Sequence, residues 1–159
     1  KTKPFLIYSL ILTKLLPCET LMLENEIMKI GKGKKVVGLE TLDFQMGLMD
    51  KMSYQLQADY LLETLADKAK SIREFNEMAE AYKKRDLEIL LKSIDAEKGM
   101  MADFENEMLH KRNLAWIPEI KKLVSDKSTF IAVGAGHLGG EKGVLQLLKN
   151  EGYTLKVIE

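Results

Sequence analysis

The spacing of apolar residues predicts a chain made mostly of helices. Between Tyr54 and Ile94, apolar residues recur three, four and seven positions apart, which is the period of one helix face. Other helices are expected over residues 4–16, 19–30, 43–51, 100–125 and 141–149. Pro17 and the glycines of 31–33 end the first two of these, and Pro118 is expected to kink the segment around it or to start a new helix.

Three short segments rich in β-branched residues predict strands, at 35–40, 128–134 and 153–158. The last two flank the helix expected at 141–149, and strands joined in this way are almost always parallel. Parallel strands need helices on both faces. The sequence therefore predicts an α/β fold, with a small mixed or parallel sheet, a C-terminal strand–helix–strand unit and a large helical layer over about 43–125.

Composition predicts a single domain over 1–159 and excludes several classes of protein. The 159 residues are 46% hydrophobic and 30% charged, which is enough to build a core. Lysine plus arginine (24) equals aspartate plus glutamate (24), and this balance argues against a nucleic-acid-binding protein. One cysteine, Cys18, excludes an internal disulfide framework, and the two histidines, His110 and His137, cannot form a multi-histidine metal site alone.

The first sixteen residues have a basic start and an apolar run, as signal peptides do. Lys14 interrupts the run, and no small-x-small cleavage site follows it. The apolar stretch is also shorter than the roughly 20 residues that span a bilayer. We therefore expect neither a signal peptide nor a transmembrane segment here. Since the chain begins with Lys1 rather than methionine, we expect a trimmed chain that lacks an upstream part.

A glycine-rich turn is the most unusual local sequence, with Gly134, Gly136, Gly139 and Gly140 around His137. It follows a predicted strand, and ligands of α/β sheets bind at that end of a strand. The glycines match the dinucleotide fingerprint G-x-G-x-x-G, although too few strands remain to complete a dinucleotide fold. Alternatively, His137 is a metal ligand or catalytic residue, or the glycines only form a tight turn and His137 bonds to the backbone.

Glu40 and Arg112 are the other candidate site residues. Glu40 ends the first predicted strand and would share a sheet edge with His137 if the two strands were neighbours. A histidine and a carboxylate together suit zinc, manganese or iron. Glu40 is otherwise explained as the cap of the helix near Asp43 or as a partner of Arg112. Arg112 suits a clamp for a carboxylate or a donor to developing negative charge, or else a supporting role.

Four motifs in order resemble the TraB/GumN family over nearly the whole chain. They are Val36-Val-Gly-Leu-Glu-Thr41, Arg112-Asn113, Trp116-Ile-Pro118 and Thr129-Phe-Ile-Ala-Val-Gly-Ala-Gly-His-Leu-Gly-Gly140, and the segment Gly143 to Tyr153 also agrees. The resemblance implies an α/β fold related to the Tiki metalloproteases, whose site uses two Gly-x-x-His motifs and a glutamate. Gly134 and His137 match the second motif and Glu40 the glutamate. The first motif would lie upstream of Lys1, so the site of this chain is expected to be incomplete.

The resemblance implies a metal-dependent hydrolase that acts on a peptide or protein outside the cytoplasm, in the periplasm or as a secreted protein or lipoprotein. A divalent ion of the Mn, Co or Zn class would be held by His137, Glu40 and an upstream histidine, with Glu40 as ligand or general base. Arg112 would orient the substrate or stabilise the oxyanion. The alternatives are a non-catalytic peptide-binding protein, since some relatives are linked to peptide-pheromone shutdown, and a nucleotide binder through Gly134–Gly139.

Overall fold

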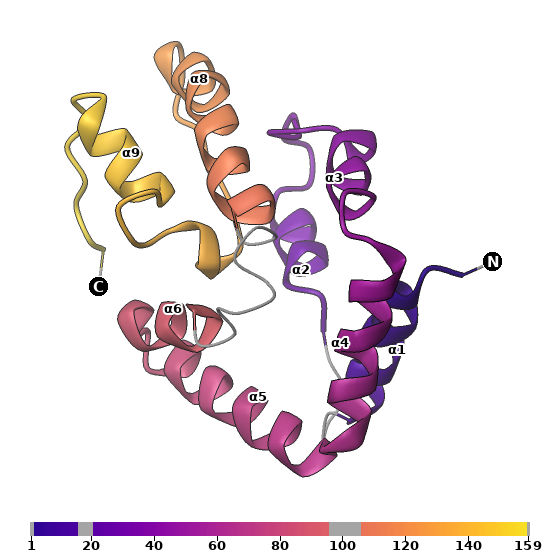
Figure 1. Ribbon diagram of the computed structural model, residues 1–159. Coiled ribbons are helices and arrows are strands. Elements are labelled where there is room, and N and C mark those ends of the chain that lie inside the picture. The colour runs from indigo at the N-terminus through magenta and orange to yellow at the C-terminus, as the bar shows by residue number, and fades with distance from the viewer. Residues whose placement is uncertain (1, 16–20, 96–105, 159) are drawn as a thin grey trace.

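The computed structural model describes residues 2–15, 21–95 and 106–158, and in this part of the chain every regular element is a helix (Figure 1). The elements are α1 (Pro4–Leu15), α2 (Leu23–Ile30), α3 (Leu42–Met49), α4 (Tyr54–Ala66), α5 (Lys68–Lys83), α6 (Leu87–Asp95), the π-helix η1 (Asn106–His110), α8 (Lys111–Ser125), the 3-10 turn η2 (Ala135–His137) and α9 (Val144–Asn150). The predicted helical character is therefore confirmed.

The predicted sheet is wrong. Residues 35–40, 128–134 and 153–158 form no strand, so the described part of the chain contains neither the sheet nor the strand–helix–strand unit. The alternation that suggested a strand is still visible in one segment, where Ile131 and Val133 pack on the core and Phe130 is 79% exposed. A strand also needs a neighbour that pairs with its backbone N–H and C=O groups, and no described segment supplies one.

The long apolar pattern from Tyr54 to Ile94 folds as three helices because polar side chains cap new helix starts within it. Ser53 accepts a hydrogen bond from the backbone N–H of Leu56 at 3.1 Å, at the start of α4. Asp67 and Asp86 do the same for α5 and α6, at 2.9 and 3.0 Å. Each side chain satisfies a backbone donor that has no partner within the first helical turn.

A hydrophobic core lies between α8 and α9, which run side by side in Figure 1. Trp116, Ile117 and Ile120 of α8 and Val144 of α9 are all buried. The side chains that pack around them are Leu39, Val124, Ile131, Val133, Leu147 and Leu148. α8 continues through Pro118, so no new helix begins at that proline. The core thus holds α8 in place against segments that are distant in the sequence.

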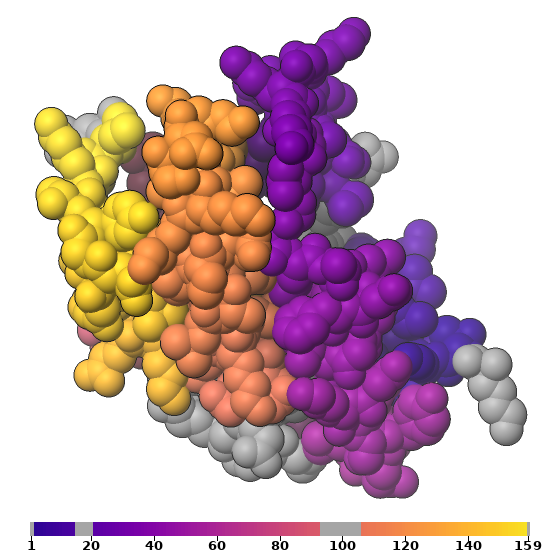
Figure 2. All heavy atoms as spheres, turned by 90° about the horizontal axis from the view of Figure 1, so that it is seen from above, coloured from indigo at the N-terminus to yellow at the C-terminus, as the bar shows by residue number. Residues whose placement is uncertain are grey.

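The N-terminal helices pack separately, with α1 against α4. The Tyr8 and Tyr60 rings meet edge to face at 5.0 Å between centroids, and the backbone N–H of Phe5 donates to Gln57 Oε1 at 3.2 Å. Figure 2 shows the orange atoms of α8 and the segment after it between the yellow C-terminal residues and the purple residues of the N-terminal half. None of the described helices is long and apolar enough to cross a membrane.

Candidate functional site

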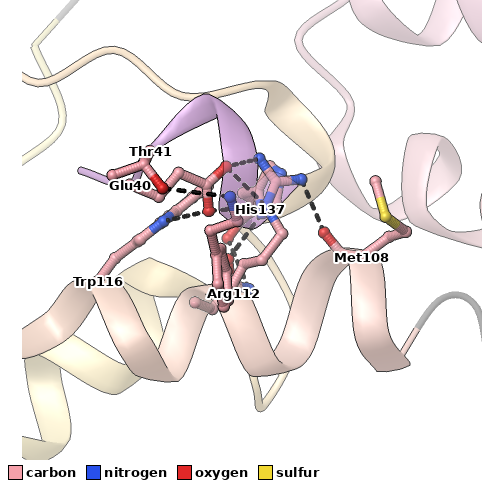
Figure 3. A network of polar contacts seen from close by, with 8 residues as sticks. Glu40, Thr41, Met108, Arg112, Trp116 and His137 are labelled. Carbon is pink, nitrogen blue, oxygen red and sulfur yellow. Dashed lines mark hydrogen bonds and ion pairs between the residues drawn. The ribbon is translucent and has the colours of Figure 1, made fainter. Parts of the chain in front are cut away.

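Glu40 is held by two side chains of α8 (Figure 3). Arg112 and Trp116 are four residues apart on this helix, so they lie on the same face. Arg112 Nη2 donates to Glu40 Oε1 at 2.7 Å, and its Nε lies 3.1 Å from both carboxylate oxygens. Trp116 Nε1 donates to Oε2 at 3.0 Å. Both oxygens of the Glu40 carboxylate therefore accept hydrogen bonds.

The ion pair between Glu40 and Arg112 is largely shielded from water. The Arg112 side chain is 10% exposed and that of Glu40 15%. The guanidinium carbon lies 5.0 Å from the centroid of the Trp116 ring, and Nη1 donates to the backbone carbonyl of Met108 at 2.9 Å. Because the guanidinium is held by a carboxylate, an aromatic ring and a carbonyl, its orientation is fixed.

His137 reaches the same cluster from the glycine turn. Its backbone N–H donates to the carbonyl of Gly134 at 2.9 Å, which closes the turn η2. The imidazole is buried against Trp116, with 4.5 Å between ring centroids and an angle of 44° between the ring planes. Nδ1 lies 2.7 Å from Oδ1 of Asn113 on α8, and the ring makes no hydrogen bond through Nε2 to the described residues.

The pKa of His137 is lowered from 6.5 to about 4. Burial is the largest cause, because it disfavours the charged imidazolium, and the positive charge of Arg112 acts in the same direction. The carboxylate of Glu40 raises this pKa and offsets part of the decrease. His137 is therefore neutral at physiological pH and carries one N–H and one lone pair.

The lowered pKa makes the stability of the metal-free protein depend on pH between about 6.5 and about 4. In this window the unfolded chain binds a proton at His137 and the folded chain does not, so the free energy of unfolding decreases as the pH falls. We expect the wild type to lose more stability than His137→Gln between about pH 7 and about pH 4.5. Urea unfolding of both proteins at the two pH values, in EDTA to keep them metal-free, tests this. The carboxylates titrate in both proteins, so the difference between the two losses of stability reports on His137. Equal losses would contradict it.

The structure brings together the three site residues that the sequence predicts, Glu40, Arg112 and His137 (Figure 3). Among the interpretations of Glu40, a partner of Arg112 is the one observed, since the cap of α3 is Thr41, which accepts from Phe44 N–H at 3.1 Å. Neither Trp116 nor Asn113 was assigned a site role from the sequence. The signal for Trp116 was its helical spacing from Arg112, which places it on the same face of α8, whereas Asn113 had only its place in the Arg112-Asn113 motif.

The glycine turn does not lead directly into a helix. Residues 138–143 separate η2 from α9, whereas the dinucleotide fingerprint passes from glycines into a helix N-terminus. Gly139 also faces α6, because a Cβ there would lie 2.7 Å from side-chain carbons of Leu87 and Leu91. Gly140 has a φ of +77°, which a glycine adopts without strain. This geometry favours the turn as a support for His137 over a phosphate cradle.

Comparison with models of protein families gives a match that covers nearly the whole chain. The model of the TraB/PrgY/gumN family matches residues 2–157. The chain belongs to the TraB/PrgY/gumN family. Comparison with curated proteins and comparison with solved structures each gave no match.

The described residues of this TraB/PrgY/gumN protein fit a metal ion in part. His137 suits a ligand, since Asn113 engages Nδ1 and the ring is neutral. Glu40 does not suit one in this arrangement, because N–H donors occupy both of its oxygens. Among residues 2–15, 21–95 and 106–158, no three or more histidine, cysteine, aspartate or glutamate side chains group to hold an ion. This part of the chain thus offers one protein ligand.

Proposed function

We propose that this chain belongs to a metal-dependent hydrolase that cleaves peptides, and that His137 is one of its metal ligands. The observation that carries the proposal is the state of His137, which is neutral, hydrogen-bonded at Nδ1 and without a hydrogen bond at Nε2 to the described residues. A metal-binding histidine typically bonds through one ring nitrogen and donates the other N–H to a neighbouring oxygen. The buried Glu40–Arg112 pair beside it supports a site rather than an isolated core histidine.

In this proposal His137 holds a divalent ion of the Mn, Co or Zn class through Nε2, and the remaining ligands come from outside the described residues. When bound, such an ion polarises the scissile carbonyl and lowers the pKa of a coordinated water. Because His137 protonates only near pH 4, it stays able to bind an ion through the neutral range. Its burial against Trp116 keeps the imidazole in one orientation.

Glu40 and Arg112 have supporting roles in the proposed site. Three N–H groups hold the Glu40 carboxylate, so it acts as a fixed negative charge and not as a mobile ligand or base. A guanidinium carries five N–H donors, and bonds within the described part of the chain use three of those of Arg112. The others suit the carbonyl oxygen of a bound peptide, where they would stabilise developing negative charge.

The proposal is tested with the two histidines of the chain as a matched pair, His137→Gln and His110→Gln. Titration with Mn²⁺, Co²⁺ or Zn²⁺ alone, followed by calorimetry, measures the affinity. We expect His137→Gln to weaken metal binding by about 10-fold or more. Losing the hydrogen-bonding partner of a metal ligand typically costs about this much affinity, and losing the ligand itself should cost at least as much. His110→Gln should bind as the wild type does. Thermal unfolding of both variants shows that each one is folded.

A quenched fluorescent peptide library then measures hydrolysis with each metal and with EDTA. We expect cleavage by the wild type that EDTA abolishes and that His137→Gln lacks. If the wild type binds no divalent ion, or cleaves equally well in EDTA, the proposed function is wrong. If peptides bind to the wild type and to His137→Gln with equal affinity and neither protein cleaves them, the chain is a peptide-binding protein.

A further inference from the structure

Asn113 is the most deeply buried polar residue next to the candidate site, with 1% of its surface exposed. It lies on α8 between Arg112 and Leu114. Its amide makes three contacts, all with the turn that carries His137 or with the loop after it. Oδ1 lies 2.7 Å from His137 Nδ1, and Nδ2 donates to the backbone carbonyls of His137 at 3.3 Å and Lys142 at 2.9 Å.

These contacts determine which way the Asn113 amide faces. The carbonyl oxygens of His137 and Lys142 are acceptors only, so the amide group that faces them must be the NH₂ donor. In the flipped orientation, Oδ1 would face two carbonyl oxygens and neither would receive a hydrogen. Oδ1 therefore faces the imidazole, and an amide oxygen can only accept. The hydrogen of the 2.7 Å bond must then be on Nδ1 of His137.

We infer that Asn113 is a positioning residue that holds His137 as the Nδ1–H tautomer and so keeps the lone pair of the imidazole on Nε2. Nε2 is also the ring nitrogen that makes no hydrogen bond to the described part of the chain. Only this nitrogen can then bind a metal ion or accept a proton. The consequence for metal binding rests on the proposed function, whereas the tautomer does not.

The same amide couples the tautomer to the shape of the loop. By bonding to the carbonyls of His137 and Lys142, Asn113 connects the two ends of the segment 137–142 to α8. A loop movement that broke these bonds would also release the imidazole. Asn113 thus fixes both the position and the protonated nitrogen of His137.

The test is the tautomer of His137 in metal-free protein, read from the ¹⁵N shifts of both ring nitrogens in histidine-labelled chain at neutral pH. His137→Gln assigns the signals by removing one of the two histidines. In the wild type we expect a protonated Nδ1 and an unprotonated Nε2. In Asn113→Leu, which removes the acceptor, we expect protonated Nε2 to appear. Asn113→Asp keeps an oxygen acceptor beside Nδ1 and should keep Nδ1 protonated, although it loses the two hydrogen bonds to the carbonyls of His137 and Lys142.

Metal affinity gives a second measurement on the same variants. We expect Asn113→Leu to bind Co²⁺ about 10- to 100-fold more weakly than the wild type, the usual effect of losing such a partner. A wild type whose Nε2 carries the proton would overturn the inference, even if Asn113→Leu failed to fold. An Asn113→Leu protein that is less stable but keeps the wild-type tautomer of His137 would also overturn the inference. If the tautomer is as expected but no ion binds, the proposed function fails and the role of Asn113 stands.

Discussion

Replacing Arg112 with leucine is expected to lower the free energy of unfolding by about 3–5 kcal/mol, because it leaves Glu40 as a shielded charge without its ion-pair partner. Trp116 Nε1 alone would remain to donate to the carboxylate. The change also removes the contact of the guanidinium with the Trp116 ring. Urea unfolding at neutral pH measures the effect.

An exposed ion pair of the same chain serves as the control for this substitution. Lys92 and Glu88 are four residues apart on α6, with side chains 70% and 79% exposed. We expect Lys92→Leu to leave the free energy of unfolding almost unchanged, because water screens such pairs. The double variant Glu40→Met with Arg112→Leu should regain most of the loss, since it removes both charges. Equal effects of Arg112→Leu and Lys92→Leu would show that shielding of the Glu40–Arg112 pair contributes nothing.

The sequence predicts the helices well because their signals are local. The apolar period, Pro4 in the first turn of α1 and the capping side chain of Thr41 all act within a few residues of the chain. The break between α4 and α5 was missed, although Asp67 is a capping residue, because the apolar pattern continues across it. The shorter helix that begins after Asp86 was predicted from the sequence, and α6 confirms it. α9 begins at Val144 and not near Glu141, since Gly143 is its N-cap.

The sheet could not be predicted because a strand depends on a partner that may be far away in the sequence. Alternating apolar residues determine only that one side of a segment packs on the core. Ile131 and Val133 do so against buried residues of α8 and α9. Whether the backbone then pairs is decided by which other segment lies beside it. Leu39, Ile131 and Val133 pack on buried residues of the helices α8 and α9, whereas residues 153–158 are exposed.

The residue types of the candidate site were predictable from the sequence, but the contacts between them were not. Residue chemistry singled out Glu40, His137 and Arg112. The ion pair between Glu40 and Arg112 joins residues 72 positions apart. No local sequence pattern shows whether the arginine donates hydrogen bonds to this carboxylate. The sequence therefore left Glu40 open as a ligand, a general base or a partner of Arg112, and the structure shows that N–H donors of Arg112 and Trp116 engage both of its oxygens.

Replacing Gly143 with alanine is expected to destabilise the protein by about 3 kcal/mol, at the upper end of the usual cost of overpacking. A Cβ at this position would collide with the backbone carbonyl of Gly139 and lie 2.5 Å from the carbonyl oxygen of Leu138. These atoms are backbone, so no side-chain rotation relieves the overlap. The φ of Gly143 is −75°, which alanine adopts readily, so the whole cost is steric.

Gly47→Ala is the matched control, because a Cβ on that glycine of α3 meets nothing within 4 Å. Alanine favours a helix interior over glycine, so this variant should gain about 0.5–1 kcal/mol. The two glycine-to-alanine changes are thus expected to have opposite signs in thermal unfolding. Lys142, whose carbonyl accepts from Asn113, precedes Gly143 in the same loop. Gly143→Ala should therefore also weaken the contact of Asn113 with the His137 ring, which would change the ring ¹⁵N shifts. A stable Gly143→Ala protein with unchanged His137 signals would show that this close backbone packing does not support the site.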